Sequence, residues 1–393
     1  MRKVGESQGD FRPRCLSIDL EVGVKDNRVH EFAAVRGDDG KSLVRGNQNL
    51  HVGLKKLDAF AEGLTFLLGH NLIAFDLPHL AAVEPDLAIL AWPAVDTLWL
   101  NPLAFPRNPY HRLVKHYQDG QLHRGRLNDP ELDARLTLDV FHDQRDAFVE
   151  LAREAPDLLL AWHWLTTGND AVTGLNAFFT SIRQAPRPTD EGGIHAVESY
   201  LLDRCCVTAA REALADVEVH AWPLAYAMAW LSVAGGNSVM PPWVGHQFPE
   251  AGHWVRKLRD TPCENPRCEW CRERHDARKE LKRWFGFDDF RPEPVDDQGR
   301  PLQCVIVEAA MRGEHVLGVL PTGTGKSLCY QIPAMHRRGV AIVVSPLIAL
   351  MKDQVDNLEK KGITDAVTVN GLLDPIERGK SIERVREGIA SIL

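Results

Sequence analysis

A glycine-rich turn around residue 323 has the residue types that bind phosphate. Residues 321–327 read PTGTGKS, and backbone N–H groups at such a turn, together with Lys326 and Ser327, can hold phosphate oxygens and Mg²⁺. Leu320 stands where the usual pattern G-x-x-x-x-G-K-[ST] has its first glycine. We expect a nucleotide-binding loop made of Thr322, Gly323, Thr324, Gly325, Lys326 and Ser327.

Four carboxylates in the first third of the chain could bind divalent cations. Asp19 and Glu21 lie two positions apart in CLSIDLEVG, so a strand would turn both side chains to one face. Asp76 falls at an expected helix start, and Asp133 lies within an expected helix. Hard oxygen ligands from separate elements suit two Mg²⁺ or Mn²⁺ ions, which can activate water for phosphodiester cleavage. A solvated strand face is the alternative for Asp19 and Glu21.

A cluster of cysteines lies in the stretch DTPCENPRCEWCRERH. Cys263, Cys268, Cys271 and His275 have the spacing C-x4-C-x2-C-x3-H, and three thiolates with one imidazole suit tetrahedral Zn²⁺. The polar flanks disfavour a small cysteine-containing core, so we expect a structural zinc site. Residues 256–283 also hold ten Lys or Arg against six Asp or Glu. This is either a local patch for DNA or a solvated, charged helix.

The composition is that of an ordinary soluble globular protein. The chain has 393 residues, of which 44% are hydrophobic and 25% charged, and its net charge is −8. This balance excludes a uniformly basic surface but allows a local basic patch. The polar N-terminus predicts no secretory signal, and the apolar runs are too short to span a membrane. We therefore expect a cytoplasmic protein with no membrane partner.

The elements that would position these residues follow an α/β pattern. Gly318–Leu320 and Val340–Val344 are expected to be buried parallel strands, and residues 328–335 a helix that follows the phosphate loop. Residues 151–255 have helical periodicity, and their tryptophans are expected in the core. We expect four segments: a front domain at 1–150, a helical connector at 151–255, a zinc-binding segment at 256–283 and a nucleotide-binding lobe at 284–393.

The last segment resembles the RecQ family of ATP-dependent DNA helicases. LPTGTGKSLCYQIPA followed by VVSPLIALMKDQVDNL is similar to that family, including the non-glycine residue at position 320. RPLQCVIVEAAMRGEHVL resembles its adenine-reading motif, with Gln303 in the glutamine position. Both Arg291, in Phe-Arg-Pro, and Arg300, in Arg-Pro, match the arginine that precedes this motif, so the choice stays open. The resemblance implies a partial RecA-like P-loop lobe that binds ATP and Mg²⁺.

The resemblance also sets an expectation about turnover. No acidic D-E-x-H box follows Ser327 in this sequence. We expect the N-terminal part of a helicase, with the missing lobes supplied in cis or in trans. By itself this chain should bind ATP without hydrolysing it.

The front domain resembles the DEDD (DnaQ-like) 3′–5′ exonucleases, which have a ribonuclease H-like fold. The resemblance covers about residues 12–150 and implies that the catalytic metal ligands are Asp19, Glu21, Asp76 and Asp133, with Asp139 a competing choice for the last. Asn128 stands where one branch of the family has a histidine base, and Asp129 where the other has a tyrosine. Neither is a usual general base, which leaves His123 as a candidate from a loop.

These expectations combine into one hypothesis and two alternatives. The chain is expected to be the N-terminal portion of a RecQ-like DNA helicase fused to an exonuclease-like domain. It would act on single-stranded or 3′-tailed DNA in unwinding or processing, during repair, recombination or defence. The first alternative is a DNA-binding module with an inactive exonuclease fold and a lobe that binds nucleotide without hydrolysing it. The second is a nucleotide-switched scaffold that does not bind DNA.

Overall fold

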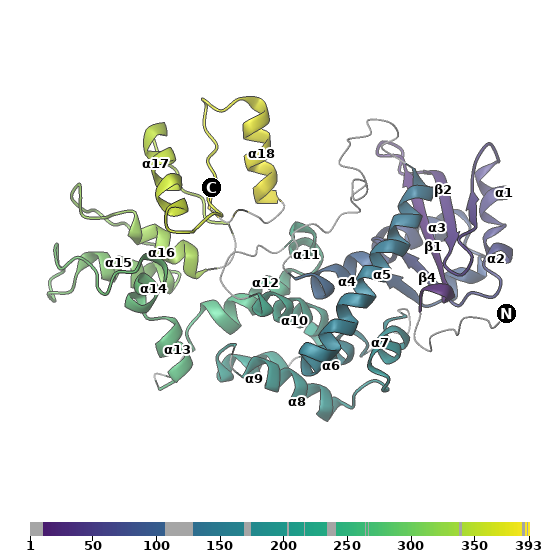
Figure 1. Cartoon of the computed structure of the whole chain (residues 1–393), viewed down its shortest axis with the longest axis horizontal. Coiled ribbons are helices and arrows are strands. Elements are labelled where there is room, and N and C mark those ends of the chain that lie inside the picture. The colour runs from purple at the N-terminus through teal and green to yellow at the C-terminus, as the bar shows by residue number, and fades with distance from the viewer. Residues whose placement is uncertain are drawn as a thin grey trace, which may run out of the picture. The chain divides into compact units, whose positions relative to one another are not determined.

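The computed structural model describes residues 11–106, 129–168, 174–202, 204–215, 217–233, 241–263, 265, 267–337, 340–386, 390 and 392–393. The chain divides between Val197 and Glu198 into two compact units, the first unit and the second unit. In Figure 1 the first unit is coloured from purple to teal and the second unit from green-teal to yellow. The division lies inside helix α8 (Asp190–Leu201), so the segment expected to be a single helical connector contributes to both units.

A five-stranded sheet with the order β3-β2-β1-β4-β5 forms the centre of the first unit. β2 is antiparallel to β1 and β3, whereas β4 is parallel to both β1 and β5. The strands are β1 (Cys15–Val22), β2 (Val29–Arg36), β3 (Ser42–Val44), β4 (Phe66–Gly69) and β5 (Ala94–Asp96). Within β1 only residues 15–17 pair with β4, so the carboxyl half of β1 extends beyond β4.

Alternation along β1 sorts its side chains between the two faces of the sheet. Leu16, Ile18 and Leu20 are buried in an apolar core shared with three short helices. These helices are α1 (Leu50–Leu54), α2 (Leu57–Phe60) and α3 (Leu77–Val83). Asp19 and Glu21 therefore belong to the opposite face, where the long helix α5 (Pro130–Glu154) packs against β1 and β2 (Figure 1).

Aromatic side chains fill the space between the sheet, α5 and the helices that follow it. Phe11 contacts Phe66 of β4 and Phe141 of α5, and Phe178 contacts Phe148. Trp162 is also buried, as expected of a core tryptophan. The remaining helices of this region are α4 (Thr97–Ala104), α6 (Pro156–Thr166) and α7 (Leu175–Arg183).

The described part of the second unit consists of helices and connecting segments. Its first helices are α9 (Val207–Ala215), α10 (Val217–Ser232), α11 (Pro242–Gln247), α12 (Pro249–Val255) and the π-helix η4 (Arg256–Asp260). They are followed by α13 (Glu269–Arg274), α14 (Ala277–Phe285), α15 (Leu302–Met311), α16 (Leu328–His336), α17 (Ile348–Glu359) and α18 (Pro375–Arg386). An apolar core that includes Leu281, Val307, Ile332 and Leu358 joins α14, α15, α16 and α17.

The two strands expected on either side of α16 do not form, and that prediction is wrong for this structure. Residues 318–320 and 340–344 have no strand assignment, and Ala341 makes one isolated parallel bridge to Ile392. The physical reason is a lack of paired neighbours, since a strand is stable only within a ladder. Val319 and Val344 are accordingly 82% and 89% exposed.

Among the described residues, none of the helices is both long and apolar enough to cross a bilayer.

Candidate functional site

The phosphate loop has the backbone conformation that its glycines permit. Gly323 and Gly325 both have φ of +80°, a region that side chains with a Cβ rarely adopt. Lys326 donates from Nζ to the carbonyl oxygen of Leu320 at 2.9 Å, and Ser327 precedes the first residue of α16. The loop therefore leads directly into a helix N-terminus, where backbone N–H groups attract anions.

Gln303 of α15 connects the segment around Arg291 to the phosphate loop. Its side chain is 3% exposed, and Nε2 donates to the carbonyl oxygen of Gly325 at 2.8 Å. Its Oε1 accepts from the backbone N–H of Arg291 at 3.2 Å. A Cβ at Gly325 would lie 2.9 Å from Gln303 Nε2 and would displace this amide from its contact with the loop.

A pocket of about 400 Å³ opens beside this connection. Its lining includes Phe287, Arg291, Gln303, Gly325, Ser327 and Lys361. Arg291 also donates from its guanidinium to the carbonyl oxygen of Gly323, whereas Arg300 pairs with Asp296 at 2.8 Å and lies outside the lining. Of the two arginines that the sequence left open, the structure places Arg291 at the pocket.

Three of the four candidate metal-binding carboxylates meet in the first unit. Oxygen atoms of Asp19, Glu21 and Asp133 all lie within 4.8 Å of one another. Ser17 of β1 donates from Oγ to the carbonyl oxygen of Ala134 at 2.8 Å, which fixes this part of α5 against the strand. Carboxylate oxygens at this separation suit a shared Mg²⁺ or Mn²⁺ ion.

Asp76 is buried next to this group but directs one oxygen to the backbone. Its Oδ1 accepts from the N–H of Leu20 at 3.1 Å, on the part of β1 that has no β4 partner. Burial raises the pKa of Asp76 well above its ordinary value, and the negative charge of Asp19 raises it further. A bound cation would favour the ionised carboxylate and reverse both effects.

Of the residues considered as general bases, the structure describes only Asp129. Asn128 and His123 lie outside the described residues. Asp129 caps α5, since its Oδ1 accepts from the N–H of Leu132 at 3.3 Å. Asp139, the competing metal ligand, is exposed and 3.6 Å from the guanidinium of Arg12, so the structure groups Asp133 and not Asp139 with Asp19.

The cysteine cluster contains four thiols, one of which the sequence analysis missed. The Sγ atoms of Cys206, Cys263, Cys268 and Cys271 all lie within 4.8 Å of one another. Cys206 belongs to the connection between α8 and α9, 62 positions before Cys268 in the chain. The neighbouring pair Cys205-Cys206 was a usable signal, but it lies within a stretch of helical periodicity.

His275 does not complete the cluster, in contrast to the expectation. Its Nδ1 lies 3.0 Å from Nε2 of His336 at the end of α16. Burial lowers the pKa of His275 to about 4, with a further contribution from His336. Cys206 takes the fourth position instead, because its backbone N–H donates to the carbonyl oxygen of Leu258 and its thiol lies 3.7 Å from that of Cys268.

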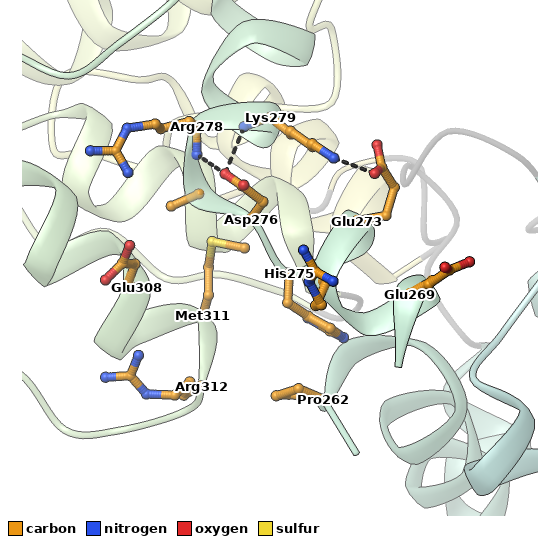
Figure 2. Close-up of a pocket in the computed structure, with 12 residues that line it drawn as sticks. Pro262, Glu269, Glu273, His275, Asp276, Arg278, Lys279, Glu308, Met311 and Arg312 are labelled. Carbon is orange, nitrogen blue, oxygen red and sulfur yellow. Dashed lines mark hydrogen bonds and ion pairs between the residues drawn. The ribbon is translucent and has the colours of Figure 1, made fainter. Parts of the chain in front are cut away.

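The charged segment 256–283 is extensively ion-paired. Seven of its ten basic residues have an acidic partner, so the structure favours the solvated, charged surface over a dedicated DNA patch. A pocket of about 730 Å³ opens here. Figure 2 shows its lining, in which Asp276 accepts from the backbone N–H groups of Arg278 and Lys279 while the ammonium of Lys279 pairs with Glu273.

Comparison with known proteins identifies a helicase domain in the C-terminal part of the second unit. Residues 300–393 match the DEAD/DEAH box helicase family. This range contains Gln303, the phosphate loop and α16, and it places a RecA-like helicase domain in this part of a mixed α/β structure.

The C-terminal part has homologues among the RecQ-family helicases. The chain is 50% identical to the rat ATP-dependent DNA helicase Q5 over 88 residues, which is 22% of this chain and 8% of that protein. It is 45% identical to RecQ of Haemophilus influenzae over 91 residues, or 23% of this chain and 13% of the relative. The chain is 40% identical to RecQ of Bacillus subtilis over 114 residues, which is 29% of this chain and 18% of the relative. The chain thus matches less than a fifth of the length of each of these relatives.

Proposed function

We propose that the second unit binds ATP as part of a RecQ-like DNA helicase activity, with single-stranded or 3′-tailed DNA as the partner. The observation that carries this proposal is the contact of Gln303 with Gly325, within the range that matches the helicase family. The three relatives described above are named ATP-dependent DNA helicases, and these names support ATP and DNA as ligands.

The pocket and the adjoining phosphate loop would divide the nucleotide between them. The ring of Phe287 offers an apolar face for adenine. Gln303 would read the adenine edge after its amide leaves the carbonyl oxygens of Thr324 and Gly325, to which it donates in this structure. Lys326 and the backbone of residues 323–325 would hold the phosphates, and the Ser327 hydroxyl would bind Mg²⁺. Mg²⁺, when bound, neutralises charge on the phosphate oxygens.

Binding without turnover is the expected behaviour of this polypeptide. Hydrolysis in this class needs an acidic residue at the metal and a group that orients water. Asp289 is the one carboxylate among the described residues lining the pocket, and it pairs with Arg278 at 2.9 Å.

A binding titration with a fluorescent ATP analogue tests the proposal. Lys326→Ala removes a charged hydrogen-bond donor, which should weaken the affinity by about tenfold or more. Lys352→Ala is the matched control, because Lys352 is an exposed lysine of α17 that belongs neither to the phosphate loop nor to the pocket lining. Equal affinity in the Lys326→Ala variant and its control would reject the nucleotide site.

A second function, that of a 3′–5′ exonuclease-like domain, is favoured by the carboxylates of the first unit. Asp19, Glu21 and Asp133 lie within 4.8 Å of one another, and Asp76 lies beside Leu20 of the same strand. The sheet order β3-β2-β1-β4-β5, with β2 antiparallel to its neighbours, is compatible with the ribonuclease H-like fold that the sequence resembles. A pair of Mg²⁺ or Mn²⁺ ions, when bound, supplies an activated water and stabilises the leaving oxygen of a phosphodiester.

The nuclease activity should be weak or absent. A general base contributes about 10²- to 10⁴-fold, and neither Asn128 nor Asp129 is a usual one. Degradation of a 3′-labelled single strand with Mn²⁺ measures this activity, comparing Asp19→Asn with the control Asp139→Asn. Brisk degradation lost only in Asp19→Asn would contradict the expected weakness and assign an active exonuclease.

The binding-module alternative predicts DNA binding without nuclease activity. Such a protein would bind DNA in a salt-dependent way with no Mn²⁺-dependent degradation at all. A nucleotide-switched scaffold would show neither. DNA binding measured at two salt concentrations, with and without ATP, separates these alternatives.

A further inference from the structure

We propose that Cys206, Cys263, Cys268 and Cys271 bind one zinc ion, and that this ion connects the α8–α9 turn to the segment that precedes the helicase domain. The site differs from the three-cysteine, one-histidine arrangement that the local spacing suggests. It also joins parts of the second unit that are distant in the chain.

The sulfur atoms already stand at tetrahedral separations. Four sulfurs about 2.3 Å from one zinc ion in a tetrahedron are about 3.8 Å from each other. The Sγ atoms of Cys206 and Cys268 are 3.7 Å apart, and those of Cys263 and Cys271 are 3.5 Å apart. These are the two opposite edges of one tetrahedron, so both pairs fit a single ion.

Other cysteine chemistries fit this arrangement less well. A disulfide would join two sulfurs at about 2.0 Å and separate that pair from the other two, whereas here all four are mutually close. In an iron–sulfur cluster the cysteines bind different iron atoms, which separates their sulfurs further. Four soft thiolates around one position are the ligand set typical of structural zinc.

The surrounding backbone supports thiolate ligands. The N–H of Cys263 donates to Sγ of Cys271 at 3.3 Å, and a donor of this kind favours the charged form of a sulfur. Cys206 and Cys271 are buried while Cys263 and Cys268 are half-buried, which leaves one side of the cluster open to solvent. An ion can therefore enter without unfolding of the segment.

The segment also needs a stabilising ion. Residues 261–275 read TPCENPRCEWCRERH, so they offer few apolar side chains for a core of their own. Short segments of this kind are commonly held by metal, and the binding free energy then becomes folding free energy. Cys206 would add a long-range constraint, since its backbone N–H already donates to Leu258 of η4 at 3.3 Å.

Metal analysis of the purified 393-residue protein and three variants tests this site. The wild type should carry about one zinc per chain. Cys206→Ser should lose most of it, whereas His275→Gln and Cys205→Ser should retain it. Cys205 is the matched control because it is the adjacent, equally buried cysteine outside the cluster. Zinc kept by Cys206→Ser and lost by His275→Gln would overturn the assignment, as would a wild type without zinc.

A cobalt titration of the wild-type protein keeps the test independent of variant folding. Co²⁺ bound by four thiolates gives tetrahedral visible bands and a sulfur-to-metal charge-transfer band whose intensity follows the number of thiolates. We expect the intensity of four. An intensity corresponding to three thiolates would exclude Cys206 from the site.

Discussion

His275 and His336 contact each other through their ring nitrogens, with Nδ1 of the first 3.0 Å from Nε2 of the second. His275 follows the cysteine cluster by four positions, and His336 is the last residue of α16, the helix that begins at the phosphate loop. Arg259, just before the cluster, donates to the carbonyl oxygen of His336 at 3.3 Å. The proposed zinc segment therefore holds the far end of the helix whose first turn would bind phosphate.

The buried carboxylate of Glu280 lies on the other side of the His336 ring from His275. Glu280 pairs with Arg274 at 3.1 Å, accepts from the indole of Trp284 at 2.9 Å and lies 3.7 Å from His336 Nδ1. Burial alone would raise the pKa of Glu280, but His336 and Arg274 outweigh burial and lower this pKa to about 2. The carboxylate is thus charged at neutral pH and depends on these partners.

Removing the imidazole of His336 should destabilise the second unit. His336→Ala leaves Glu280 with fewer partners, and the expected cost is about 1–3 kcal/mol. We expect a lower thermal midpoint and faster amide exchange in α16, measured by mass spectrometry. His315→Ala is the control, because His315 is exposed in the same unit. Unchanged exchange in α16 would show that the His275–His336 contact does not hold this helix.

Arg291 and Arg300 should differ in their effect on nucleotide affinity. Arg291 lines the pocket and contacts Gly323 of the phosphate loop, whereas Arg300 pairs with Asp296 on the surface. Arg291→Ala should weaken binding of the ATP analogue by a factor of about ten, while Arg300→Ala should leave it within about twofold of wild type. The same titration measures both variants, and a larger loss in Arg300→Ala would reverse the assignment.

The carboxylate group of the first unit could be anticipated because it depends on local rules. The two-residue period of a strand puts Asp19 and Glu21 on one face, and the structure brings Asp133 to that face. The choice between Asp133 and Asp139 needed the family resemblance, since both lie on α5. Burial of Asp76 depends on where β4 ends, which periodicity alone does not reveal.

Local spacing alone identified neither the role of Cys206 nor the absence of the two strands, because both depend on partners that are distant in the chain. Cys206 reaches the cluster through tertiary packing across 62 positions, so local spacing selected the nearby His275 instead. Residues 340–344 have the apolar run of a buried strand, but a strand also needs partners that local sequence does not specify. Here Ala341 finds a single bridge partner in Ile392.

Acidification should destabilise the first unit through His163. Burial lowers the pKa of this histidine to about 4 from 6.5, and the charges of Arg183 and Arg187 add to the effect. The unfolded chain therefore binds more protons between pH 6.5 and 4, so stability is present above pH 6.5 and falls as the pH drops towards 4. The loss should be on the order of 1 kcal/mol by pH 5, after allowance for solvent screening.

Thermal unfolding at pH 7.5 and pH 5 measures this loss in His163→Gln and in the control His142→Gln. Gln can replace the contacts of His163 with Asn176 and Arg183 without titrating. We expect a smaller pH dependence in His163→Gln and an unchanged one in His142→Gln, because His142 is exposed. Equal pH dependence in all three proteins would assign the effect to other groups.

Mn²⁺ should stabilise the first unit through Asp133 but not through Asp139. A ligand that binds only the folded state raises stability by RT ln(1 + [L]/Kd), so the thermal midpoint should rise with Mn²⁺ concentration. Asp133→Asn removes one of the three carboxylates that lie within 4.8 Å of one another, and the rise should largely disappear. Asp139→Asn, on the same helix but paired with Arg12, should keep it. Asp133→Asn also relieves repulsion among the three carboxylates. Without metal, this variant should therefore be at least as stable as the wild type. A Mn²⁺-dependent rise that survives in Asp133→Asn would show that the cation binds elsewhere.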